Sequence, residues 1–491
     1  MTASSGIARR MKMNRFLANA DMVEMGNDHP PHEPGNIEHR TSNIEHRTGI
    51  TSNFAFAALL IIFLVGTTNV PAETILLQNA VVHTVSGDTF TNGSVLINGD
   101  RIERVIDGKN TERVVADKTI DLKGRHLYPG LIALDSALGL SEIEAIRATQ
   151  DTTEVGEFTP DVQSWIAVNP DSELLPVARA NGITHIEPAP QGGVVAGMSG
   201  VLALDGWTTE EMTIKHPAAL HVYWPEMELN AMPKEKWRDK SKFKSLEEQA
   251  RERQTKIKEL DDFFQEARAY AKGRAAIGKD GVPADPGINP PWEAMLPAAR
   301  GEVPLMLHAN DLRQIKAAVK WAQTNDYKMI LVGGRDAWLV ADLLAARKIP
   351  VIYEFTFNQP RRDFDSYDVN FKAPEVLRKA GVTVAFSIGS GSFSVPLAKN
   401  LPYDAAQAVA FGLPEGEALK GLTLYPAQLL GVDKRLGSIE PGKEATLFVC
   451  DGDILDIRAN VKQLWIAGRE ISLESRHTRL YEKYKNRPLP K

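Results

Sequence analysis

The chain has 491 residues, of which 43% are hydrophobic and 24% charged, values close to those of average soluble proteins. Its formal net charge of −6 is small for this length and no block of like charge stands out, so the sequence predicts neither a nucleic-acid partner nor binding to an anionic membrane surface. The single cysteine, Cys450, excludes an internal disulfide and a thiolate metal cluster.

The first 52 residues are unlike the rest of the chain. The same six-residue sequence occurs at residues 36–41 and again at 43–48, in a stretch with almost no apolar content that cannot build a core. We interpret residues 1–52 as a disordered leader or an extension upstream of the true start. A histidine-bearing metal tract is the alternative, because several histidines lie in this segment.

An unbroken apolar run at residues 54–65 has the length of a signal-peptide core and is followed by residues 70–72, which fit a cleavage site. Residues 53–72 are therefore predicted to be a signal peptide ending near Ala72, and the protein to be secreted or periplasmic. Retention as an uncleaved N-terminal anchor is the alternative. We expect no other association with a membrane.

Short strands with tight turns occupy both ends of the remaining chain, at residues 73–125 and 430–475. Asn98 and Gly99 between alternating apolar residues indicate a hairpin, because both central positions of a type I′ turn need positive φ. The second segment contains a strand at residues 445–450, which places Cys450 in a buried strand. The two segments predict one composite β-sandwich built from both ends of the mature chain.

Residues 126–429 alternate between strand and helix patterns, which is typical of a parallel barrel. The eight candidate strands are residues 127–134, 182–186, 194–204 (with an added hairpin as an alternative), 219–223, 304–308, 329–332, 350–355 and 382–387. The predicted fold class is therefore α/β, a (β/α)₈ TIM-like barrel plus the small β-sandwich. A charged insert at about residues 234–272 carries an apolar stripe and is interpreted as one or two helices that pack on the barrel wall, with a lid or partner-binding role as the alternative. Residues 476–491 form a C-terminal tail.

Four segments resemble the amidohydrolase superfamily, in its imidazolonepropionase-like branch. They are residues 121–132, the strand at 304–309, the helix and turn at 405–427, and the closing residues 437–445. The resemblance covers nearly everything from residue 73 to 473. It implies a barrel that holds one or two divalent metals at the C-terminal ends of its strands and hydrolyses amide or other C–N bonds in a small substrate.

Most of the metal ligands that the resemblance implies are replaced in this chain. Asp135 and Ala137 stand where the family carries the two histidines of an Asp-x-His-x-His run. His308 matches the family's metal-binding histidine, but the next strand ends in glycines before Asp336. The eighth strand ends in hydroxyl residues, among them Ser390, where the family has a metal-binding aspartate that acts as base.

Other donors at the same rim can rebuild a site, since residues at the C-terminal ends of barrel strands face one cavity. We hypothesise that Asp135, His221 and His308 bind zinc and leave one position open for water, with Glu354 and Asp135 as catalytic carboxylates. Ordinary barrel histidines beside a salt-bridged carboxylate are the alternative. Four further residues are candidate contacts to a small-molecule substrate: His185, Arg361, Arg362 and Ser390.

The sequence thus predicts an exported hydrolase acting on C–N bonds other than peptide bonds, with a reduced or relocated metal site. A catalytically inactive relative that uses the barrel for binding or as a scaffold is the alternative. The glycine-rich run at residues 191–200 is interpreted as a tight loop, rather than an anion-binding nest or the site of a nucleophilic Ser199.

Overall fold

A computed structural model describes residues 73–488 except 110–113 and 278–286. Contacts divide the chain into residues 1–69 and 70–491, and only the second unit is described below. The predicted leader and signal peptide lie outside the described residues. No helix in the described part of the chain is long and apolar enough to span a bilayer.

The first sheet combines strands from both ends of the described chain, in the order β16-β15-β14-β5-β1-β2-β3, with β4 paired to β1. Their bounds are β1 Thr74–His83, β2 Thr89–Asn98, β3 Arg101–Ile106, β4 Lys118–Asp121, β5 His126–Pro129, β14 Leu447–Cys450, β15 Val461–Ile466 and β16 Arg469–Glu470. Gly99 has φ +59° in the predicted β2–β3 turn, and Cys450 is buried in β14 as expected. All these strands are hydrogen-bonded into one sheet, so the two-layer sandwich stays a prediction.

The second sheet is the barrel, with strand order β13-β12-β11-β10-β9-β8-β7-β6. Its strands are β6 Leu131–Ser136, β7 Ile183–Pro188, β8 Val195–Ala203, β9 Thr213–Tyr223, β10 Leu305–Ala309, β11 Met329–Gly333, β12 Val351–Tyr353 and β13 Val384–Phe386. The interior is filled by an apolar cluster that includes Met306, Ile330 and Ile352. The predicted TIM-like barrel is therefore confirmed.

Two details of the predicted barrel are wrong. β8 runs antiparallel to both β7 and β9, because the short connection from Pro188 to Val195 cannot carry the crossover of a dozen or more residues that a parallel neighbour needs. The predicted first strand at residues 127–134 is two strands, β5 in the first sheet and β6 in the barrel. Gly130 is the switch between them, where a Cβ would lie 2.1 Å from Thr184 Oγ1.

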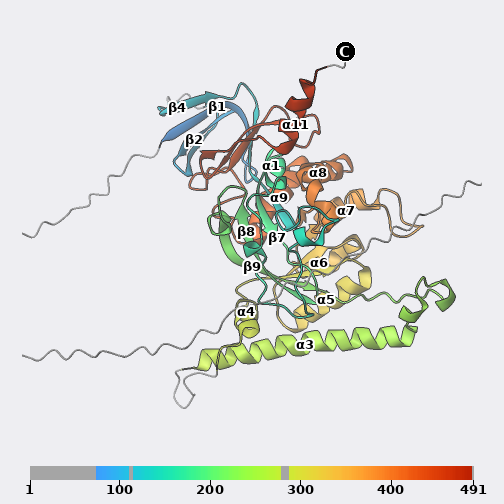
Figure 1. Cartoon of the computed structure of the whole chain (residues 1–491). Coiled ribbons are helices and arrows are strands. Elements are labelled where there is room, and N and C mark those ends of the chain that lie inside the picture. Colours follow the sequence, from blue (N-terminus) through green and yellow to red (C-terminus); the bar gives the residue numbers. More distant parts are fainter. Residues whose placement is uncertain (1–72, 110–113, 278–286, 489–491) are drawn as a thin grey trace, which may run out of the picture. The chain divides into compact units, whose positions relative to one another are not determined.

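Helices follow all the barrel strands except β7, and α5 to α8 lie beside one another along the strands (Figure 1). The α-helices are α1 Leu174–Arg179, α2 Thr209–Met212, α3 Leu246–Ala276, α4 Pro290–Ala299, α5 Leu312–Thr324, α6 Ala341–Ala346, α7 Val369–Lys379, α8 Leu401–Ala410, α9 Glu415–Leu422, α10 Leu424–Leu429 and α11 Arg476–Lys485. The 3₁₀ turns are η1 Arg147–Thr149, η2 Ser164–Ile166, η3 Lys234–Lys236, η4 Lys240–Lys242, η5 Ala337–Val340 and η6 Ser392–Asn400.

The charged insert contains one long helix, α3, of 31 residues, which begins at a capping box on Ser245. Its buried side chains are Leu260, Phe264 and Ala267, spaced three and four residues apart on one face. Phe264 packs edge-on against Trp321 of α5 at 5.0 Å between ring centroids. This face of α3 therefore packs on the helical layer of the barrel.

Gly468 lies where segments from the two ends of the described chain approach closely, since a Cβ on it would lie 1.9 Å from Gly99 O. We expect Gly468→Ala to lower the free energy of unfolding by about 1–2 kcal/mol for its positive φ and about 1–3 kcal/mol more for the clash. Gly442→Ala is the matched control, because Gly442 also has positive φ but nothing lies within 4 Å of its Cβ position. Urea denaturation measures both variants, and equal losses would contradict the prediction.

Candidate metal centre

Three metal-ligating side chains meet at the C-terminal end of the barrel. Asp135 comes from β6, His221 from β9 and His308 from β10, and one ligand atom of each lies within 4.8 Å of the others. Asp135 and His221 are fully buried, and the side chain of His308 is 11% exposed. The barrel thus brings together the three ligands predicted from the sequence, from segments almost 90 residues or more apart in the chain.

A bulge in β6 directs Asp135 into the barrel. The pairing of β6 with β7 shifts register between Ala133 and Ser136, and Asp135 adopts φ +45°. A bulge re-aims the side chain of the residue that it contains, and aspartate tolerates the left-handed region better than most residues. Ser390 Oγ donates to Asp135 Oδ2 at 3.2 Å and so fixes the carboxylate from β13's side.

Glu187, at the end of β7, ties two of the three ligands together. One carboxylate oxygen accepts the backbone N–H of Asp135 at 2.7 Å, and the other lies 2.8 Å from His221 Nε2. The proton of this second contact lies on Nε2, because a carboxylate can only accept. His221 Nδ1 is therefore an acceptor, and it lies 3.0 Å from His308 Nε2.

Glu354, the predicted base, follows β12 and lies beside Asp135. Burial, and then the charge of Asp135, raises the pKa of Glu354 well above its ordinary value. Burial also raises the pKa of Asp135. Glu354 Oε1 and Asp135 Oδ1 are both buried without a hydrogen-bond partner among the described residues. Two adjacent buried carboxylates cannot both be ionised unless a proton or a cation offsets their charge.

The donor set fits a divalent cation such as zinc. In a tetrahedral site with bonds of about 2 Å, ligand atoms lie about 3.3 Å apart. The His221 Nδ1 to His308 Nε2 distance of 3.0 Å is close to this value, and His308 Nε2 to Asp135 Oδ1 is 4.0 Å. Burial, and then His221, lowers the pKa of His308 well below 6.5, which favours the neutral imidazole that binds metals. The unpartnered Asp135 Oδ1 would supply the third donor.

Of the four residues predicted to contact substrate, Ser390 lies at the three-ligand group and His185 does not belong to it. Ser390 touches Asp135, as described above. His185 lies two residues before Glu187 on β7, its Nδ1 is 3.0 Å from Thr184 Oγ1, and burial, followed by the charge of Arg435, lowers its pKa to about 3. It is not part of the three-ligand group.

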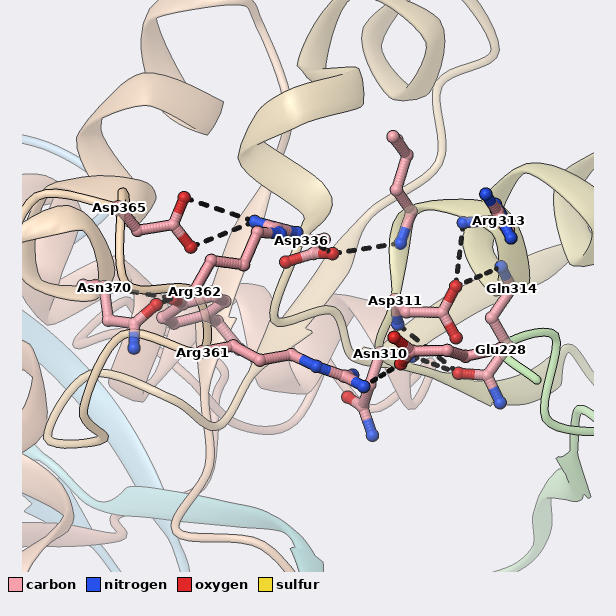
Figure 2. A network of polar contacts seen from close by, with 12 residues as sticks. Glu228, Asn310, Asp311, Arg313, Gln314, Asp336, Arg361, Arg362, Asp365 and Asn370 are labelled. Atoms are coloured by element: carbon pink, nitrogen blue, oxygen red, sulfur yellow. Dashed lines mark hydrogen bonds and ion pairs between the residues drawn. The ribbon is translucent and has the colours of Figure 1, made fainter. Parts of the chain in front are cut away.

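Arg361 and Arg362 are held by carboxylates in a polar network at the barrel rim (Figure 2). Arg361 pairs with Glu228. Arg362 pairs with Asp336 and, at 3.0 Å, with Asp365. Both guanidinium groups therefore already have anionic partners. The sequence could not indicate the pairs Arg361–Glu228 and Arg362–Asp336, because their members lie 133 and 26 residues apart in the chain.

Two residues of this centre had no assigned role in the sequence-based hypothesis, although Glu187 ends the second predicted barrel strand at the same rim. Glu187 orients His221, and its place before Pro188 at a strand end was the available indication. Tyr223 stacks on His308, with 4.0 Å between ring centroids and 13° between planes. Tyr223 lies two residues after His221, so alternation along β9 puts both side chains on one face.

Comparison with known proteins agrees with this architecture. The amidohydrolase family profile matches residues 368–471. The crystal structure of an amidohydrolase from Thermotoga maritima superposes with a TM-score of 0.69 at 27% sequence identity, covering 81% of this chain and 99% of that one. The amidohydrolase tasK of Hapsidospora irregularis is 25% identical over 404 residues, which are 77% of this chain and 39% of the relative.

The imidazolonepropionase of Rhizorhabdus wittichii is 26% identical over 182 residues, or 37% of this chain and 41% of the relative. The chain therefore spans less than half the length of these two relatives. Together with the barrel and the closing sheet, these similarities confirm the resemblance to the amidohydrolase superfamily that the sequence shows.

Removing Glu187 is expected to destabilise the fold. Glu187→Ala leaves His221 Nε2 and the Asp135 N–H buried without an acceptor, and we expect a loss of about 2–5 kcal/mol in the free energy of unfolding. Glu187→Gln keeps an acceptor and should lose less. Glu247→Ala, which removes an exposed carboxylate paired with Arg251, is the control and should change stability by less than about 1 kcal/mol. Guanidinium unfolding of the metal-free protein would contradict this prediction if all three variants matched the parent.

Proposed function

We propose that this protein is a metal-dependent hydrolase that cleaves C–N bonds other than peptide bonds in a small substrate. The observation that carries the proposal is the convergence of Asp135, His221 and His308 within 4.8 Å, with Glu354 beside them. Export by the N-terminal segment is part of the proposal and rests on the sequence pattern alone. The class of bond is inferred from the similarity to amidohydrolases.

Each residue of the centre has a role that its contacts support. Asp135, His221 and His308 would hold the cation, and a bound divalent cation would polarise a water or a carbonyl oxygen. Glu354 would take the proton from the attacking water, since its carboxyl group lies beside Asp135 and its Oε1 has no hydrogen-bond partner among the described residues. Glu187 keeps the lone pair of His221 on Nδ1. Tyr223 limits the rotation of the His308 ring.

A noncatalytic role is the second candidate, and two positions favour it. Gly333 ends β11, and Ser387 follows β13 with its Oγ donating to Leu134 O at 2.7 Å. Ser387 thus uses its hydroxyl in a structural contact and is a weak ligand in any case. A barrel that offers no imidazole or carboxylate at these two positions could bind a small molecule without turning it over.

Zinc content tests the metal site directly. We expect about one zinc per chain after reconstitution, measured by elemental analysis, and its loss in His308→Ala because two remaining ligands bind weakly. His477→Ala is the control, since His477 is exposed on α11 and should leave the content unchanged. Absence of zinc and of other divalent cations in the reconstituted parent would overturn the metal site.

Turnover tests the role of Glu354. On a panel of N-acyl amino acids and cyclic amides, Glu354→Gln should lower kcat by roughly 10²–10⁴-fold while zinc remains bound. The amide keeps the size of the carboxylate but cannot accept the proton. Glu252→Gln on α3 is the control, as Glu252 is exposed and pairs with Lys244. A parent that binds zinc but hydrolyses none of the panel would favour the noncatalytic role.

A further inference from the structure

Two cavities lie at the opposite end of the barrel from the metal ligands. The first, of about 540 Å³, is lined by residues before β10, β11 and β12 and by the end of α10. The second, of about 730 Å³, lies between α3 and α4. Tyr327 and Lys328 line both, so the two cavities adjoin. Each has the volume of a typical small-molecule site.

Basic side chains outnumber acidic ones in the walls of both cavities. Lys215, Lys328, Arg347 and Lys348 line the first cavity, where Glu302 is the acidic residue. The second cavity adds three basic residues, Arg268, Lys272 and Arg300, and its acidic residue is Asp326. Seven basic residues thus face two acidic ones, although the whole chain carries a net charge of −6. We call these seven residues the basic groove.

Most cations of the basic groove form no ion pair in the described part of the chain, although the charge of Asp433 acts on Lys215. Lys215 Nζ donates to Leu430 O at 2.6 Å, and Lys328 Nζ to Gly301 O at 3.3 Å. In the described part of the chain, Lys272, Arg347 and Lys348 form no ion pair. Carbonyl oxygens orient an ammonium group without cancelling its charge, so the groove keeps a positive potential that a bound anion would offset.

Two further residues of the basic groove are engaged more weakly than in a full ion pair. Arg300 lies 3.9 Å from Glu302, at the outer limit of an ion pair. Arg268 donates to Asn325 O, and its guanidinium lies 4.2 Å from the Tyr327 ring centroid, which fixes its orientation by a cation–π contact. The first wall also holds Gln323, whose Nε2 is buried without a partner among the described residues.

We propose that the basic groove binds a small polyanion, a molecule with two or more phosphate or carboxylate groups. The site is separate from the metal centre, because Lys215 precedes His221 by six residues on β9, or about 20 Å along the strand. The cations come from β9, α3, the end of α4, the turn before β11 and the end of α6, so no charge block marks the groove in the sequence.

Calorimetric titration of EDTA-treated protein tests this proposal, with tripolyphosphate and citrate as separate probes. EDTA treatment and a His308→Ala variant keep chelation at the metal centre out of the readout, so the result does not depend on the proposed function. We expect saturable binding that weakens as salt rises from about 0.05 to 0.5 M. Tighter binding of tripolyphosphate would assign the ligand to phosphates, and tighter binding of citrate to carboxylates.

Charge reversal locates the ligand. Arg347→Glu with Lys348→Glu should weaken binding at least tenfold, and Lys272→Glu, in the second cavity, provides an independent variant should the first fail to fold. Lys316→Glu with Lys320→Glu is the matched control, since both lysines are exposed on α5 outside the groove, and it should change affinity less than twofold. No saturable binding of either probe below about 10 mM, or equal weakening by the control, would overturn the proposal.

Discussion

The candidate metal centre depends on the contacts of one buried group, the carboxylate of Glu187. It accepts from a backbone N–H on β6 and from an imidazole on β9, so a single side chain on β7 fixes both the bulge and the ring beside it. This acceptor satisfies the backbone N–H of Asp135 in the conformation with φ +45° and so stabilises that conformation. The site is therefore organised by a residue that does not itself touch the proposed cation.

The surroundings of this centre explain why its groups have shifted pKa values. Below it the barrel is filled with aliphatic side chains such as Met306, Ile330 and Ile352. Burial against that layer is the main cause of the raised pKa of Glu354 and of the lowered pKa of His308. Both shifts disfavour the charged form of each group. A bound divalent cation would favour the ionised carboxylates and so lower their pKa values again. It would also bind the neutral form of the imidazole.

The sequence predicts those parts of the molecule that local patterns determine. Alternation and turn chemistry predict the strands at both ends, and the position of a side chain at a strand's C-terminal end predicts that Asp135, His221, His308 and Glu354 face one cavity. The antiparallel direction of β8 follows from the length of the link to β7, which is too short for a parallel crossover. The pairing of Arg361 with Glu228, and the gathering of the basic groove, depend on tertiary contacts that no local pattern contains.

The distribution of donors around the mouth argues for a single cation rather than a pair. The ligands lie on β6, β9 and β10, whereas β11 ends in Gly333 and the hydroxyl after β13 is bound to Leu134 O. A second cation needs its own donors within about 2 Å, and the side of the mouth formed by β11 and β13 offers no imidazole or carboxylate at those two positions. Glu354 on the intervening strand is then left free of a second ion, which is the condition for it to act as a base rather than as a ligand.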